Sequence, residues 1–232
     1  MTYVMSDIHG QYEKYKAMLE KIAFSEDDTL YVLGDVVDRG EESMRILSDM
    51  SMRANVIPLM GNHEHMAEHV LRAVNVEITE ESIETNWNAD LIRAIQEWYE
   101  NGGYLTSKDF SRLSLEDREY ILDYLEEFSF YEELTVGENT FVLIHGGLPD
   151  FSPEKALEEY HPVGALYART DYGKRYYPDK YLVTGHTPTF LIDPDYDGRI
   201  YIANGHIAID CGVCHGKKLG CIRLEDLAEF YV

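Results

Sequence analysis

The sequence is poor in cysteine and in positive charge. Three cysteines among 232 residues are too few to suggest a disulfide framework. Lys and Arg number 20 against 43 Asp and Glu, and the net charge of −23 argues against nucleic acid or an anionic membrane as a partner. The sequence has no run of about 18 apolar residues that would span a membrane, and its N-terminus lacks the pattern of a secretory signal. We therefore expect a cytoplasmic protein that forms one globular domain over residues 1–232.

The first third of the chain repeats one unit three times: a short apolar strand, a polar loop and an amphipathic helix. The expected strands are 3–5, 29–33 and 55–60, and the expected helices are 11–24, 42–52 and 64–74. Pro58 disfavours a central position for the third strand, because proline has no backbone N–H to donate to a neighbouring strand. In open α/β sheets ligands bind at the carboxyl ends of the strands. The three polar loops are therefore expected to converge on one site.

The rest of the chain changes character twice. Residues 75–131 predict a helical insertion with helices at 87–99 and 114–128, separated by a break at Asn101-Gly-Gly103. We expect this insertion to lie beside the site rather than to form a separate domain. Strands are expected again at 133–136, 140–144, 181–184, 199–203, 206–210 and 218–224. Together these elements indicate an α/β (α+β) fold.

Polar residues follow five of the expected strands. They are Asp7, His9, Asp35, Asn62, His145 and His186. Such oxygen and imidazole donors without thiolates suit Mn²⁺, Fe or Zn²⁺. Six donors exceed the need of one tetrahedral ion and suit two ions about 3.5–4 Å apart with a shared carboxylate. Such a pair lowers the pKa of a bound water, which can then attack phosphorus in line.

The stretch Gly34-Asp-Val-Val-Asp-Arg-Gly40 adds groups that suit phosphate. Arg39 supplies a planar fork that matches two phosphate oxygens. His63 lies next to Asn62 and can protonate the leaving oxygen. Asp38 can hold the other ring nitrogen of His63.

Five stretches resemble the signatures of the phosphoprotein-phosphatase branch of the metallophosphoesterases, in the family's order. They are Ser6-Asp-Ile-His-Gly10, Gly34 to Gly40, Gly61-Asn-His-Glu64, His145-Gly-Gly147 and Gly185-His-Thr-Pro188, which together span about four-fifths of the chain. The resemblance implies the metallophosphoesterase fold, a sandwich of two β-sheets flanked by helices. Ser6 replaces a glycine of the first signature, from which we expect little effect.

The same resemblance implies a role for each matching residue. Asp7 and His9 would bind the first metal ion, Asp35 would bridge both ions, and Asn62, His145 and His186 would bind the second. Arg39, Asn62 and Arg169 would bind phosphate, and His63 with Asp38 would act as the acid. The match at Arg169 rests on an aromatic residue shortly before an arginine, in Leu166-Tyr-Ala-Arg169.

Trp98 with Asn101-Gly-Gly103 resembles the insertion of compact bacterial and phage members of the family. The first hypothesis is therefore a small bacterial-type serine/threonine protein phosphatase that uses two ions, Mn²⁺ first among them, and acts on phosphorylated proteins or peptides. The alternatives are a symmetrical dinucleoside tetraphosphate hydrolase, which acts on a small phosphoester, and a catalytically inactive phospho-ligand binding module. Cys211-Gly-Val-Cys-His215 matches a haem-attachment pattern, but its context favours cysteines that pack in the interior.

Overall fold

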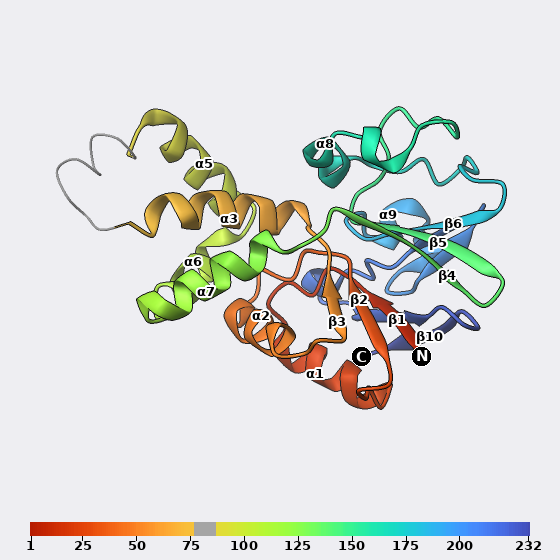
Figure 1. Cartoon of the computed structure of the whole chain (residues 1–232), viewed down its shortest axis with the longest axis horizontal. Coiled ribbons are helices and arrows are strands. Elements are labelled where there is room, and N and C mark those ends of the chain that lie inside the picture. Colours follow the sequence, from red (N-terminus) through yellow and green to blue (C-terminus); the bar gives the residue numbers. More distant parts are fainter. Residues whose placement is uncertain (77–86) are drawn as a thin grey trace.

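The computed structural model describes residues 1–76 and 87–232. The structure contains two β-sheets, which lie in the right-hand half of Figure 1. The first sheet has the order β10-β9-β1-β2-β3 and consists of β1 (Thr2–Met5), β2 (Thr29–Val32), β3 (Val56–Pro58), β9 (Gly220–Arg223) and β10 (Ala228–Tyr231). Strands β1, β2 and β3 are parallel. Pro58 lies in β3 at the edge of the sheet, as its missing N–H predicts.

The second sheet has the order β4-β5-β6-β8-β7. Its strands are β4 (Tyr131–Val136), β5 (Asn139–Ile144), β6 (Lys180–Thr184), β7 (Tyr201–Ala203) and β8 (His206–Ala208). Strands β5, β6 and β8 are parallel, while β4 and β7 run antiparallel to their neighbours. Each sheet therefore has three parallel strands, and loops leave the carboxyl ends of all six.

Alternation along the strands divides the apolar side chains between separate cores. In β1, Val4 packs in one cluster with Leu143 of the second sheet, whereas Met5 faces a different cluster that contains the helices. In β5, Leu143 belongs to the shared cluster and Val142 to a third one on the far side of its sheet. Because successive side chains of a strand point to opposite faces, one face of each sheet packs on the other sheet. This confirms the predicted sandwich.

Three helices follow the first three strands and supply much of the core on the outer face of the first sheet. They are α1 (Tyr12–Lys21), α2 (Ser43–Ser51) and α3 (Asn62–Val74), close to the predicted ranges. Helix α3 begins at Asn62, two residues earlier than predicted. Asn62 and His63 therefore lie in its first turn, held by the helix rather than by a loop.

The predicted insertion is helical where the structure describes it. It contains α5 (Ala89–Glu100), α6 (Gly103–Phe110) and α7 (Leu115–Glu126), which extend to the left in Figure 1 with α3; residues 77–86 of the predicted range lie outside the described residues. Ser114 caps α7, and its Oγ accepts a hydrogen bond from Asp117 N. The expected break at Asn101-Gly-Gly103 is only a turn, because α6 begins at Gly103.

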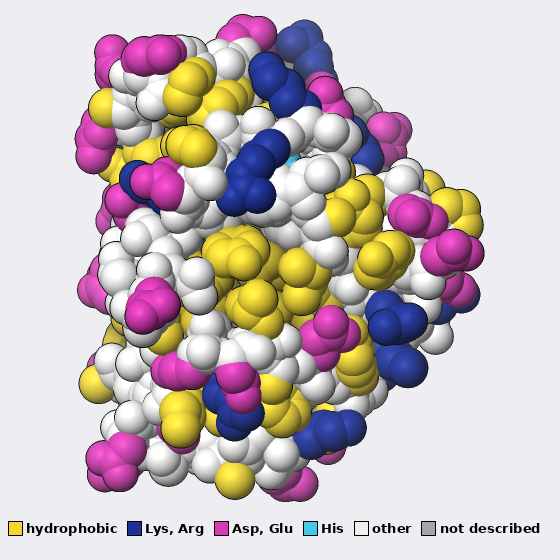
Figure 2. Space-filling model, turned by 90° about the vertical axis from the view of Figure 1, so that its right-hand side faces the viewer, with side chains coloured by type: hydrophobic (Ala, Val, Ile, Leu, Met, Phe, Trp, Pro, Cys, Tyr) yellow, Lys and Arg dark blue, Asp and Glu magenta, His cyan; other side chains and the backbone are white. Residues whose placement is uncertain are grey.

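Short helices complete the chain: α8 (Pro162–Tyr167), α9 (Thr189–Ile192) and 3₁₀ turns at Leu157–Glu159, Pro194–Tyr196 and Val213–His215. Figure 2 shows the face at the right of Figure 1, where hydrophobic side chains gather near the centre among acidic and basic ones. Among the described residues, no helix has both the length and the apolar character needed to cross a bilayer.

Candidate active site

The predicted site residues lie where the parallel strands of both sheets end. Asp7, Asp35 and Asn62 follow β1, β2 and β3, while His145 and His186 follow β5 and β6. Backbone hydrogen bonds join the first two loops, from Asp7 N to Gly34 O and from His9 N to Asp35 O. The two sheets therefore bring together residues that are up to 179 positions apart, as in the hydrogen bond from His186 N to Asp7 Oδ2 at 3.0 Å.

The backbone of the site is unusual. Six of its residues have positive φ angles in the left-handed region: Asp7, His9, Asp35, Asp38, Arg39 and His186, with φ between 48° and 71°. For residues other than glycine this conformation is uncommon, and it persists only where the surroundings impose it. Such outliers cluster at functional sites, so their concentration here supports a binding or catalytic role for these loops.

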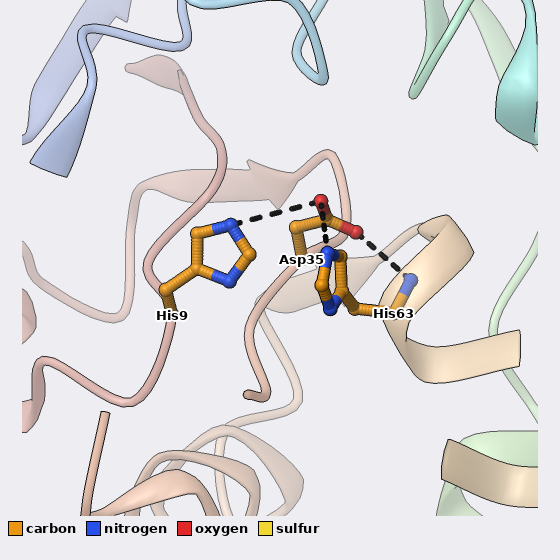
Figure 3. Close-up of side chains that lie close together, drawn as sticks. All are labelled: His9, Asp35 and His63. Carbon is orange, nitrogen blue, oxygen red and sulfur yellow. Dashed lines mark hydrogen bonds and ion pairs between the residues drawn. The ribbon is translucent and has the colours of Figure 1, made fainter. Parts of the chain in front are cut away.

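One group of potential metal ligands consists of His9, Asp35 and His63 (Figure 3). The Nε2 atoms of both histidines lie 3.8 Å from Asp35 Oδ2, and His63 N donates to Asp35 Oδ1 at 3.1 Å. Nδ1 of His9 faces Val37 O at 2.9 Å, which leaves Nε2 for another partner. His63 thus lies as close to the bridging carboxylate as the predicted ligand His9 does. Asp7 belongs to neither group of potential ligands among the described residues.

A second group contains Asp35, His145 and His186, with Asn62 among them. Asn62 Oδ1 lies 3.0 Å from His145 Nε2 and 2.9 Å from His186 Nδ1. His145 Nε2 is also 3.3 Å from Asp35 Oδ1. The structure therefore brings together all four residues that were predicted to bind the second ion.

The protonation state of His145 tests whether this second group fits a cation. The ring is fully buried, and burial lowers its pKa, so it is neutral. Its Nδ1 faces Leu33 O at 2.6 Å and must carry the single ring proton. The lone pair of Nε2 then faces the oxygens of Asn62 and Asp35. Three electron-pair donors that converge without a hydrogen between them fit a metal ion.

The carboxylates of the site also favour cations. Burial and then the charge of Asp210 raise the pKa of Asp7, while burial and then the charge of Asp7 raise the pKa of Asp35. Buried like charges destabilise one another unless a counter-charge lies between them. A divalent ion supplies that counter-charge.

The two residues that were predicted to act together as the acid lie in contact. His63 Nδ1 and Asp38 Oδ2 are 2.7 Å apart, and both side chains are buried. Arg39 donates through Nη2 to His63 Nε2 at 2.9 Å and through Nη1 to His9 Nε2 at 3.0 Å. The guanidinium therefore bridges the two imidazoles at the site.

These groups open into a cavity of about 530 Å³. Its lining includes Asp35, Arg39, Asn62, His63, Arg169 and His186, and the exposed side chains of Tyr167 and Leu191 lie at its walls. Burial lowers the pKa of His186 to about 4, and the positive charge of Arg169 contributes next. Arg169 forms no ion pair with a described carboxylate and so presents its charge to the cavity.

Three residues near the site were not predicted. Glu64 is fully buried, and its carboxylate accepts hydrogen bonds from the backbone N–H groups of Asp35, Val36, Val37 and Gly61 at 2.7–3.0 Å. The sequence offered one signal for this role: Glu64 lies three residues after Gly61, the N-cap of α3, where a glutamate commonly accepts hydrogen bonds from backbone N–H groups. It fixes the loop that carries Asp35.

The other two are Asp210 and Cys214. Asp210 is buried, lines the cavity and follows β8, so the strand-end pattern could have identified it. Cys214 Sγ accepts a hydrogen bond from Arg39 Nη1 at 3.2 Å, a contact that no sequence pattern indicated. Cys211 is buried as predicted, whereas the same prediction is wrong for Cys214, which is only partly buried because its thiol meets the Arg39 guanidinium. All three cysteines are free.

Residues 2–218 match the calcineurin-like phosphoesterase family. The chain belongs to this family. The family level of the sequence prediction is therefore confirmed.

The relatives carry the name of the predicted alternative rather than that of the first hypothesis. The chain is 31% identical over 162 residues to the symmetrical bis(5′-nucleosyl)-tetraphosphatase of Pseudomonas fluorescens (strain SBW25), over 68% of this chain and 47% of that protein. The enzyme of the same name from Xylella fastidiosa (strain M23) is 28% identical over 176 residues, which are 74% of this chain and 50% of that protein. The chain spans about half the length of these curated relatives.

A solved structure shares the fold over the whole chain. It is a crystal structure with a provisional assignment as a diadenosine tetraphosphatase, with a TM-score of 0.68 and 15% identity, covering 100% of this chain and 92% of the other. At this identity the similarity shows the fold, which is the metallophosphoesterase fold predicted from the sequence.

Proposed function

We propose that this phosphoesterase hydrolyses dinucleoside tetraphosphates symmetrically. The observation that supports this substrate is the 31% identity to a relative of that name. The cavity is also suited to a substrate with several phosphates. The chain carries a net charge of −23, yet Arg39 and Arg169 both face the cavity, and neither forms an ion pair with a described carboxylate.

In this proposal, two divalent ions are held by the residues that the sequence suggested. Asp7, His9 and Asp35 would hold the first ion, and Asp35, Asn62, His145 and His186 the second. Mn²⁺ is the first ion to test, followed by Fe and Zn²⁺. Such ions polarise a phosphoryl group and lower the pKa of water.

The arginines and the acid pair would act on the substrate. Phosphate carries negative charge and is a stronger acceptor than an imidazole nitrogen, so its binding would draw the Arg39 guanidinium away from His9 and His63. Nε2 of His63 could then carry a proton to the leaving oxygen. Asp38 would hold Nδ1 of the same ring at the observed 2.7 Å.

The motif resemblance supports a second candidate, hydrolysis of phosphoserine and phosphothreonine in proteins or peptides. Turnover of diadenosine tetraphosphate and of phosphoserine peptides by the Mn²⁺-loaded protein separates the two. Two molecules of ADP per substrate and a higher kcat/KM for the dinucleotide are expected. A higher kcat/KM for the peptides would favour the second candidate. Binding of both without hydrolysis would indicate an inactive binding module.

A further inference from the structure

The helical insertion contacts the loop that carries Asp38 and Arg39 at three points. Trp98 Nε1, on α5, donates to Asp38 Oδ2 at 2.8 Å. Thr106 Oγ1, on α6, accepts from Asp38 N at 2.8 Å. The turn between the helices supplies Gly102 O, which accepts from Arg39 N at 3.1 Å. Backbone and side chain of the loop are thus both held by the insertion.

Glycines make this close approach possible. Gly102 has φ +102°, and a Cβ atom there would lie 2.8 Å from Arg39 Cγ. A Cβ atom at Gly103 would overlap the indole ring of Trp98. A side chain at Gly102 would push the insertion away from the loop, and one at Gly103 would displace the Trp98 ring that contacts Asp38. The two glycines therefore allow α5 and α6 to pack closely against each other and against the loop.

We propose that Trp98 is a positioning residue for the acid pair. Asp38 Oδ2 accepts from Trp98 Nε1 at 2.8 Å and lies 2.7 Å from His63 Nδ1, and all three side chains are buried. Asp38 Oδ1 has no hydrogen-bond partner among the described residues. One oxygen with two donors sets the rotation of the carboxylate, and that rotation sets the orientation of the imidazole. The inference rests on the proposed role of His63 as the acid.

A buried tryptophan in a core needs no such role, so the test must separate the N–H group from the ring. Trp98→Phe keeps an aromatic ring and removes the N–H. The matched control is Tyr99→Phe, which removes another hydrogen bond of α5, from the Tyr99 hydroxyl to Ser107 Oγ at 3.0 Å, away from Asp38. Both variants lose one donor from the same helix.

The first measurement compares phenyl phosphate, which has a poor leaving group, with 4-nitrophenyl phosphate, which has a good one. For Trp98→Phe we expect kcat for phenyl phosphate to fall about 10- to 100-fold, because misplacement of a catalytic group carries costs of this size. We expect a clearly smaller fall for 4-nitrophenyl phosphate, little change in KM and an unchanged metal content. Tyr99→Phe should match the wild type on both substrates.

The second measurement needs no turnover. The chain has two tryptophans, and Trp87 is exposed whereas Trp98 is fully buried. NMR should show two indole N–H signals, one of which exchanges slowly with solvent. That slow signal should be absent in Trp98→Phe and should shift in Asp38→Asn, while the Trp87 signal stays in place.

The hydrogen bond from Asp38 N to Thr106 Oγ1 provides a rescue experiment. Thr106→Val removes the acceptor for Asp38 N with little change of volume, and Thr106→Ser restores it. We expect the loss for phenyl phosphate in the valine variant and its recovery in the serine variant.

Three results would overturn the inference. They are equal slowing of both aryl phosphates in Trp98→Phe, no slowing in a folded Trp98→Phe, and an indole signal that does not respond to Asp38→Asn. Failure of the proposed function would look different, because the wild-type protein would then hydrolyse phosphoserine peptides with a higher kcat/KM than diadenosine tetraphosphate, while the comparison of the two aryl phosphates would still test the role of Trp98. If the wild-type protein hydrolyses no phosphoester at full metal occupancy, both proposals are overturned.

Discussion

Gly185 lies so close to Ser6 that any side chain at Gly185 would displace the serine. A Cβ atom at this position would overlap both Ser6 Oγ and Asp7 Oδ2. Ser6 Oγ in turn donates to Asp7 Oδ2 at 2.5 Å. The serine that replaces the family's glycine is therefore accommodated by a glycine in the loop that follows β6 of the second sheet, and it adds a hydrogen bond to a predicted metal ligand.

Gly185→Ala is predicted to weaken metal binding. The added methyl group must move Ser6 and Asp7, and a shift of about 1 Å at a catalytic group can cost about 10²-fold in rate. We expect a lower Mn²⁺ affinity by isothermal titration calorimetry and a lower kcat at fixed metal. Gly164→Ala is the control, because its nearest atom would be 3.8 Å away and its φ is ordinary. Equal metal affinity in both variants would contradict the prediction.

Chelation is predicted to abolish hydrolysis, and Mn²⁺ is predicted to restore it best among common divalent ions. The physical reason is the convergence of oxygen and nitrogen lone pairs on the space beside Asp35. Activity should be followed together with metal content by elemental analysis after each addition. Undiminished turnover by protein that contains no metal would refute the role of the ions.

His63→Asn should slow poor leaving groups most. General acid catalysis contributes about 10²–10⁴-fold, so turnover of phosphoserine peptides should fall by about this factor and that of nitrophenyl phosphate by clearly less. The metal content of the variant also tests whether His63 is a metal ligand. This question arises because His63 Nε2 lies as close to Asp35 Oδ2 as His9 Nε2 does, at 3.8 Å. We expect full metal content in His63→Asn and loss of metal in His145→Asn. Metal loss from His63→Asn would make His63 a ligand.

Arg169→Ala is predicted to raise KM for diadenosine tetraphosphate about 10- to 100-fold, because charge-assisted hydrogen bonds to phosphate are worth about 1.5–3 kcal/mol. The control is Arg93→Ala, which removes the same charge from an exposed position on α5 outside the cavity. Both variants should keep the metal content of the wild type. If KM rises equally in both, the net charge of the protein is responsible and Arg169 does not bind the substrate.

Local sequence was sufficient for the strands except β10, which was not predicted, and for most of the proposed ligands. Asp7, Asp35 and Asn62 follow apolar runs, and a residue that follows a parallel strand lies at the carboxyl edge of its sheet. The prediction from Pro58 that the third strand would not be central is also confirmed, because β3 lies at the edge of its sheet. Such features depend only on neighbours along the chain.

Contacts between distant segments were not predictable in the same way. The hydrogen bond from Trp98 to Asp38 joins residues 60 positions apart, and the one from Arg39 to Cys214 spans 175. The helix that begins at Gly103 was missed because two glycines usually end a helix, whereas here the packing of Trp98 on the glycine favours its start.

The span of 179 residues between Asp7 and His186 has a consequence for how the protein folds. The first sheet already joins the two ends of the chain, because β1 pairs with β9. The site that contains Asp35, Asn62, His145 and His186 exists only when the two sheets lie against each other. A long loop closes more slowly than a local turn, so competence for metal binding is among the last properties to return on refolding. A divalent ion that binds only the docked state then stabilises the whole chain by mass action.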